Sequence, residues 1–234
     1  MPKEKELEEI IAAYDALVLG IESKAKTNFE GRAYGGIIRA GKGEVVESIT
    51  KMLVKIVWEK LRGEPSRIMI NRTPFLLPIK SEYLNKLERN IREEIKKNIE
   101  NYVYHYTPDV LISVDGKPVL EIECKAYTEN AMLKRILVDA TLVKSQYPEM
   151  RFALLQLESQ LGGDYSELTN KTIGSPSTHT LLSYFDIDLK IITLLKGERK
   201  VDKPIHKKEF FKPLTKPALE LAIREFEDIL RKYV

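Results

Sequence analysis

Charged side chains gather in a segment that has the pattern of two short strands and a tight turn, residues 107–127. The sequence TPDVLISVDGKPVLEIECKAY alternates apolar residues, and the Asp-Gly pair at 115–116 is a strong signal for a two-residue hairpin turn. Because side chains on a strand alternate between faces, Glu123 and Lys125 share one face. The turn brings Asp109 close to them on the neighbouring strand. We therefore expect two carboxylates and an ammonium group to converge on one point.

Such a group of charges predicts a metal-dependent hydrolase of phosphodiesters. Two carboxylates at short range repel each other unless a cation neutralises them. Oxygen ligands with open coordination positions suit Mg²⁺, or Mn²⁺ as its substitute, which keeps waters and accepts phosphate oxygens. A lysine beside the metal can orient a water molecule or assist its deprotonation. The alternative is that the charges form solvated cross-strand pairs, each worth about a few tenths of a kcal/mol.

The spacing of these residues resembles a known nuclease signature. Pro108-Asp109, thirteen intervening residues and then Glu123-Cys124-Lys125 are similar to the motif of the PD-(D/E)xK nuclease superfamily, where the turn also falls in a hairpin. The resemblance implies that Asp109 and Glu123 bind the metal. It also implies that Lys125 assists the attacking water, and that Cys124 lends its backbone carbonyl to the metal while its side chain packs inward.

The resemblance implies a further acid on a preceding helix, often in a Gly-x-x-x-Glu arrangement. Gly43 and Glu47 have this spacing, so Glu47 is a candidate catalytic residue and metal ligand. A plain solvated glutamate near a helix start is the alternative, and Glu44 is better placed for the helix dipole. Glu121 shares the face of Glu123 without an assigned role, and Gln156 is a candidate for the edge of the site.

The elements that would hold this site follow from apolar periodicity. Helices are expected at 3–18, 44–61, 81–101, 129–144, 178–185 and 214–233, and strands at 106–114, 117–127, 151–158 and 189–197. A Gly-rich segment at 31–43 precedes the second helix, and Ser81 and Thr128 are candidate helix caps. This order predicts an α/β fold, with a restriction-endonuclease-like core and a central mixed β-sheet flanked by helices on both faces. One nuclease domain would span 1–234, with its core at about 40–195.

The segment 121–158, an ExK strand that runs into a long helix and a further strand, looks most like a type II restriction enzyme that cuts a short double-stranded DNA site. A structure-selective repair or recombination nuclease, of the Holliday-junction or flap type, is the second hypothesis. A non-catalytic DNA-binding or scaffold protein is the third. Restriction enzymes that read palindromic sites are homodimers, because the protein symmetry mirrors the site. The terminal helices could form that interface or simply cover the sheet.

DNA contacts are expected from two segments. The candidate DNA-binding residues are Arg39, Lys42, Asn170, Lys171, Ser175, Ser177 and His179. The alternatives are a simple helix entry for the first two and a loop with a helix cap for the others. The basic stretch 197–212 is either a DNA contact or a solvated connector.

Composition limits the other functions. Net charge is only +3, so a polyanion must be held by a local patch. One cysteine excludes an intrachain disulfide and indicates a reducing, cytoplasmic setting. The sequence has no phosphate-binding loop, so no nucleotide cofactor is expected. No stretch approaches the ~18 apolar residues of a membrane span. The three histidines lack the spacing of metal ligands. Abundant Lys and Glu with few amides indicate a thermophilic source.

Overall fold

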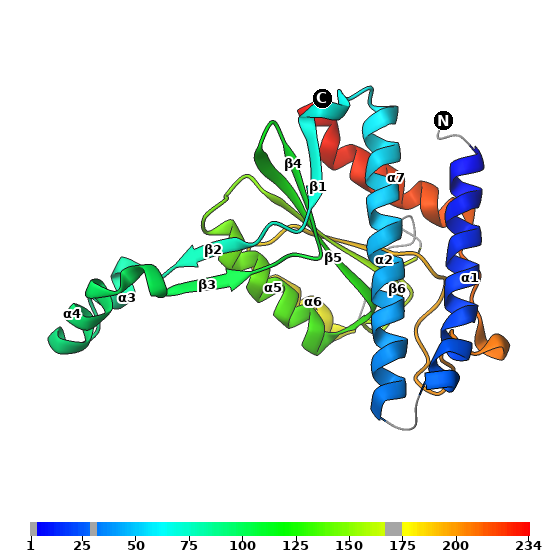
Figure 1. Cartoon of the computed structure of the whole chain (residues 1–234), viewed down its shortest axis with the longest axis horizontal. Coiled ribbons are helices and arrows are strands. Elements are labelled where there is room, and N and C mark those ends of the chain that lie inside the picture. The colour runs from blue at the N-terminus through cyan, green and yellow to red at the C-terminus, as the bar shows by residue number, and fades with distance from the viewer. Residues whose placement is uncertain (1–3, 29–31, 167–174) are drawn as a thin grey trace.

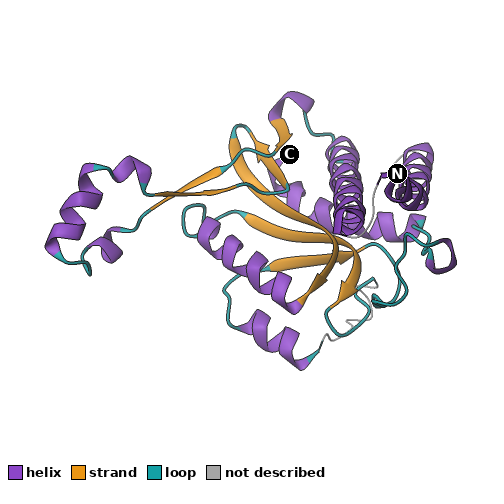
Figure 2. Cartoon of the chain, turned by 60° about the horizontal axis from the view of Figure 1, so that its bottom comes forward, coloured by secondary structure: helices purple, strands orange, loops and turns teal. Residues whose placement is uncertain are grey.

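The centre of the molecule is a five-stranded mixed β-sheet with helices on both faces (Figure 1, Figure 2). The computed structural model describes residues 4–28, 32–166 and 175–234, without the side chains of 21–28 and 32–40. The strands, in spatial order, are β1 (Ile68–Asn71), β4 (Val110–Val114), β5 (Lys117–Glu129), β6 (Arg151–Gln160) and β7 (Leu189–Thr193). The first three are antiparallel, and the last three run parallel. The predicted mixed α/β fold is confirmed.

Each face of the sheet has its own helical layer. One face is covered by α1 (Glu4–Asn28), α2 (Arg32–Lys60) and α7 (Lys216–Leu230), and the other by α5 (Asn130–Lys144) and α6 (Pro176–Ser183). The larger core joins Leu53 of α2 and Phe226 of α7 to Ile122 of β5. Short 3₁₀ turns lie at Pro65–Arg67, Ile99–Asn101, Lys208–Phe210 and Arg231–Tyr233. Within the described residues, no helix is long and apolar enough to cross a membrane.

Helix α2 begins earlier than expected. The Gly-rich segment was expected to precede the helix, but residues 32–43 are its first turns. Glycine costs about 1 kcal/mol per residue in a helix interior. Packing of α1 along α2 outweighs this cost, because tertiary contacts supply most of the stability of protein helices.

The expected helix at 81–101 is broken into α3 (Ser81–Leu84), α4 (Arg89–Lys97) and a 3₁₀ turn. The reason is that Leu84 and Ile95 are the buried residues of α3 and α4, too few to bind a continuous helix to the body. The two expected caps are also wrong. Lys80 and Glu129 occupy the cap positions, one residue away from the expected Ser81 and Thr128, and neither makes a side-chain cap bond.

A second, two-stranded sheet forms an arm that the sequence did not predict. It pairs β2 (Phe75–Pro78) with β3 (Val103–Tyr106), carries α3 and α4 at its far end, and extends away from the main body (Figure 1). Its four-residue strands are at the lower limit of the length that identifies a strand, and Pro78 weakens the strand signal further. At the base of the arm, Tyr106 packs against Leu111 and Phe152 of the main sheet. The arm therefore leads directly into the segment that carries Asp109.

Candidate active site

A tight hairpin and one extra residue place Asp109 opposite Glu123. Asp115 and Gly116 have φ of 51° and 76°, as a two-residue hairpin turn requires. Near the turn Ser113 pairs with Pro118, but beyond it Ile112 pairs with Leu120, so Val119 is a bulge residue. Without this bulge Asp109 would pair with Ile122 and point into the core, because a one-residue slip exchanges the faces of a strand.

Lys125 joins the two carboxylates. Its Nζ lies 2.6 Å from Asp109 Oδ2 and 2.5 Å from Glu123 Oε2, and Asp109 Oδ2 also accepts a 2.9 Å hydrogen bond from the Cys124 backbone N–H. The three side chains are only 12–28% exposed, so they are not the solvated pairs of the alternative interpretation. Burial lowers the pKa of Lys125, but the Glu123 and Asp109 charges outweigh it and the pKa is raised. Lys125 therefore remains protonated between them.

Tyr106 and Glu121 extend this cluster into the protein. The Tyr106 hydroxyl contacts Glu121 Oε1 and lies 2.7 Å from Glu123 Oε1. Burial raises the pKa of Glu121 to about 8, with Glu123, Asp139 and Asp109 adding to the shift and the Tyr106 hydrogen bond opposing it. A protonated Glu121 can donate to Tyr106, which then donates to Glu123. Sequence reasoning missed Tyr106, although its position three residues before Asp109 places it at the same end of the hairpin.

The opposite face of β5 belongs to the core. Cys124 is buried, and its Sγ lies 3.2 Å from the Thr50 hydroxyl on α2. Burial raises the pKa of the Cys124 thiol. The expected inward packing of this side chain is confirmed, and a buried thiol of this kind is typical of a structural cysteine.

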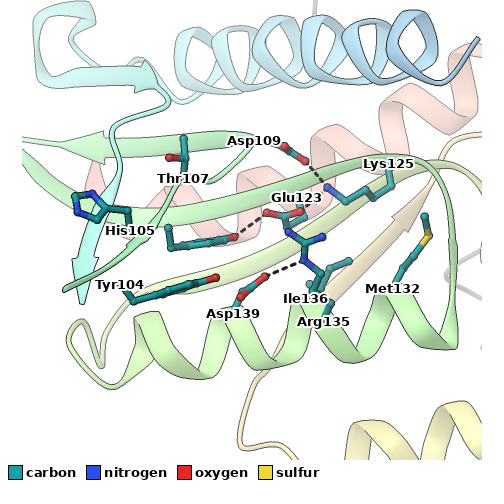
Figure 3. Close-up of a pocket in the computed structure, with 11 residues that line it drawn as sticks. Tyr104, His105, Thr107, Asp109, Glu123, Lys125, Met132, Arg135, Ile136 and Asp139 are labelled. Carbon is teal, nitrogen blue, oxygen red and sulfur yellow. Dashed lines mark hydrogen bonds and ion pairs between the residues drawn. The ribbon is translucent and has the colours of Figure 1, made fainter. Parts of the chain in front are cut away.

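A pocket of about 280 Å³ opens over the cluster between the base of the arm and α5 (Figure 3). Asp109, Glu123 and Lys125 line one side, and Met132, Arg135, Ile136 and Asp139 of α5 line the other, with Tyr104, His105, Tyr106 and Thr107 at the arm. Burial raises the pKa of Asp139, and Arg135 and Lys125 oppose this shift. The pocket is thus a charged recess into which a phosphate group could enter.

Glu47 lies on α2, outside the described lining of this pocket. Its Oε2 is 3.5 Å from Arg72 and 3.8 Å from Lys51. Arg72 follows Asn71, which pairs with Leu111, two residues after Asp109. Because Glu47 contacts Arg72, it lies at the Asp109 end of the hairpin. Glu44 is exposed. A role for Glu47 as a further metal ligand stays a prediction.

Gln156 is fully buried and donates a 3.0 Å hydrogen bond to Thr193 on β7. It pairs with Lys125 in the strand register, yet it is not among the described residues that line the pocket. Gln156 therefore supports the sheet next to the site instead of forming its edge.

The expected DNA-binding residues are not gathered at this pocket. Lys42 lies within α2 and is half-buried, so it is not part of a flexible loop, and burial lowers its pKa while the Glu158 charge opposes the shift. Ser175 caps α6 by accepting a 3.2 Å hydrogen bond from the Thr178 N–H, as in the helix-cap alternative. Ser177 is bonded to Asn130 at 3.1 Å, and His179 is exposed. Asn170 and Lys171 lie outside the described residues, as does the side chain of Arg39.

No protein-family model matches the chain. Over 232 residues it is 47% identical to the type II restriction enzyme DdeI of Desulfomicrobium norvegicum, an alignment that covers 97% of each protein. This chain belongs to the DdeI family of type II restriction enzymes. The DdeI family consists of deoxyribonucleases, the enzyme class that the hairpin motif predicts, so the scaffold hypothesis is set aside. A solved structure titled native BbvCI A2B2 tetramer at low resolution covers 98% of this chain and 90% of its own, at 12% identity and a TM-score of 0.37, a likeness too distant to add to this assignment.

Proposed function

We propose that this DdeI-family protein is a Mg²⁺-dependent restriction endonuclease that hydrolyses phosphodiester bonds within a short specific site in double-stranded DNA. Its catalytic centre would be a PD-(D/E)xK site formed by Asp109, Glu123 and Lys125. The observation that carries this proposal is the Lys125 ammonium held within 2.6 Å of both carboxylates at the floor of an open pocket. Family membership supplies the substrate class.

The donor set fits a magnesium ion. Mg²⁺ commonly binds one or two carboxylates and fills its other positions with waters and phosphate oxygens. Asp109 and Glu123 are two such carboxylates, and no cluster of three acidic, histidine or cysteine ligands occurs in the described part of the chain. The Cys124 backbone carbonyl and Glu47 are the further ligands that we propose. Mn²⁺ would substitute, because it shares the preference for oxygen ligands.

Each residue of the cluster has a role in hydrolysis. The metal, when bound, supplies electrostatic stabilisation of the charge that develops on the phosphate. Asp109 and Glu123 would hold it, and the Tyr106 hydroxyl at 2.7 Å keeps the Glu123 carboxylate in place. Lys125 would orient the attacking water, whose oxygen forms the new bond to phosphorus while the sugar oxygen leaves. The partly buried setting strengthens these charge interactions.

We further propose a homodimer acting on double-stranded DNA, without a nucleotide cofactor, in a restriction-modification system. A palindromic site presents two equivalent strands, and two copies related by a two-fold axis match it. The single nuclease domain over 1–234 would place one catalytic pocket on each strand. A methyltransferase gene beside the gene for this protein would support the restriction role without biochemistry.

Incubation of the protein with phage DNA tests the proposal. We expect discrete fragments with Mg²⁺ or Mn²⁺ and intact DNA with EDTA. Cutting confined to branched substrates would support the structure-selective nuclease instead. Absence of cutting on every DNA substrate in the presence of either metal would contradict both enzyme hypotheses.

A further inference from the structure

Arg135 is a second cation at the pocket, and it comes from outside the hairpin. It lies on α5 and lines the pocket together with Asp109, Glu123 and Lys125. In Figure 3 its guanidinium rises from the helix toward Glu123, across the recess from Asp109. The side chain is 85% exposed, so it is accessible to a ligand that enters from solvent.

The two cations differ in how fully they are engaged. Lys125 is bound to two carboxylates at 2.5 and 2.6 Å. Among the described residues, the Arg135 guanidinium is paired with Asp139, whose Oδ2 is 3.7 Å from Nε and thus beyond hydrogen-bond length. An exposed ion pair of this kind, four residues apart on a helix, contributes only about 0.3–0.5 kcal/mol. The N–H groups of Arg135 are therefore available to another anion.

A DNA phosphate is the anion that fits this position. Arginine binds phosphate with two parallel hydrogen bonds, which fixes the orientation of the group as well as its charge. A phosphate bound above Asp109 and Glu123 would have carboxylates below it and Arg135 at its open side. The carboxylates carry the same sign of charge as the DNA strand and would repel it. The Arg135 guanidinium would offset this repulsion.

We infer that Arg135 is a phosphate-binding catalytic residue that contacts a phosphate of the strand being cut, at or next to the scissile bond. The inference rests on the proposed nuclease function of the same site. It assigns a role to a residue of α5, which the hairpin motif does not include.

Single-turnover cleavage measures this role. We expect Arg135→Ala to slow cleavage at saturating DNA and Mg²⁺ by on the order of a hundredfold, the usual loss when one charge-stabilising donor is removed. Arg135→Lys should retain part of the rate, since lysine supplies charge without the planar fork. The matched control is Lys134→Ala, which removes an exposed neighbouring cation outside the described pocket lining and should cleave normally.

Two readouts separate phosphate binding from a structural role. DNA binding in EDTA should show a salt slope reduced by about one unit in Arg135→Ala, the signature of one lost phosphate contact. Single phosphates of the DNA can be replaced one at a time by uncharged methylphosphonates. At one position this replacement should slow cleavage by the wild type but not slow Arg135→Ala further, because the variant already lacks that contact. The melting temperature should be unchanged.

Loss of cleavage in step with a lowered melting temperature would overturn the inference, as would an Arg135→Ala variant that remains sensitive at every phosphate. If the wild-type protein cuts no DNA, the proposed function fails. The salt slope in EDTA then still decides whether Arg135 binds a phosphate.

Discussion

At the scale of single residues, Lys125 neutralises two carboxylates that would otherwise repel each other. Asp109 and Glu123 share its ammonium group at 2.6 and 2.5 Å. A lysine in this position offsets the repulsion between the two carboxylates, and in the proposed mechanism it would stay beside the metal. We therefore expect the same side chain to affect both stability and activity, and the two effects can be measured separately.

Lys125→Ala should abolish cleavage and destabilise the metal-free protein. Without the ammonium group the two acids face each other across a few ångströms, and a carboxylate pair without a cation is unfavourable. Added Mg²⁺ should therefore raise the melting temperature of Lys125→Ala more than that of the wild type, measured by thermal unfolding in EDTA and in Mg²⁺.

Lys97→Ala on the arm is the control, because that lysine is exposed and its ion pair with Glu94, at 3.8 Å, is long and weak. It should match the wild type in both measurements. Normal cleavage by Lys125→Ala would contradict the proposed site.

Glu121 makes stability depend on pH. Its pKa is about 8 in the folded protein against an ordinary value of 4.5. Between these values the unfolded chain loses the proton and the folded chain keeps it, so the folded state binds more protons. The free energy of unfolding should then fall with rising pH, at up to about 1.4 kcal/mol per pH unit.

Glu121→Gln should remove this decline, because a neutral amide does not titrate. The measurement is urea unfolding in EDTA at several pH values from 5 to 8. The quantity compared is the difference in the free energy of unfolding between the variant and the wild type. Glu94→Gln, at an exposed position on the arm, should show no such pH-dependent difference. A constant difference across this range for Glu121→Gln would contradict a raised pKa.

At the scale of elements, the β4–β5 hairpin determines which residues meet. Its turn requires two positive φ angles, and the bulge at Val119 then shifts the register by one residue. Together they decide that Asp109 faces Glu123 and not the core.

Gly116→Ala should lower the free energy of unfolding by about 1 kcal/mol, because φ of +76° is unfavourable for a residue with a Cβ. Gly43→Ala is the matched control, since a Cβ there meets no described atom within 4 Å in the interior of α2. It should stabilise the protein by roughly 0.5–1 kcal/mol. Denaturant unfolding measures both changes. If the two substitutions changed the free energy of unfolding in the same direction, this account would be contradicted.

At the scale of the whole molecule, a weak net charge must be reconciled with DNA as the substrate. A net charge of +3 provides little general attraction, so local groups such as the proposed phosphate contact of Arg135 would have to hold the strand. The helices α1 and α7 both contribute buried residues to the main core, including Tyr14 and Phe226. They therefore cover the sheet, one of the two roles expected for them, and leave the proposed dimer interface unassigned.

The proposed homodimer predicts a mass of about twice 26.9 kDa by light scattering, with symmetric cutting of both strands. Two-fold symmetry of the protein and of the DNA site is the reason for both expectations. A monomer at every concentration, with and without DNA, would contradict the proposal. A thermophilic source likewise stays a prediction, which the melting temperature tests.

The sequence by itself determined that Glu123 and Lys125 share a face and that Asp109 lies near them. Strand alternation and an Asp-Gly turn are local rules that act over a few residues and bring the three residues together, but the bulge at Val119 is also needed to turn Asp109 toward the same face. The same rules identified the helices on both faces, because their apolar periodicity is strong. They misplaced the Gly-rich start of α2, where packing of α1 outweighs local propensity.

Only the tertiary structure decided what surrounds the three charges. Tyr106 reaches Glu121 and Glu123 because the arm joins the sheet at its base, and Arg135 reaches the pocket because α5 packs over the same face. The bulge at Val119 has no signal in the residue pattern, since its neighbours are apolar as well. Contacts of this kind depend on the packing of distant elements, and pairwise packing between distant segments is not encoded in any short stretch of sequence.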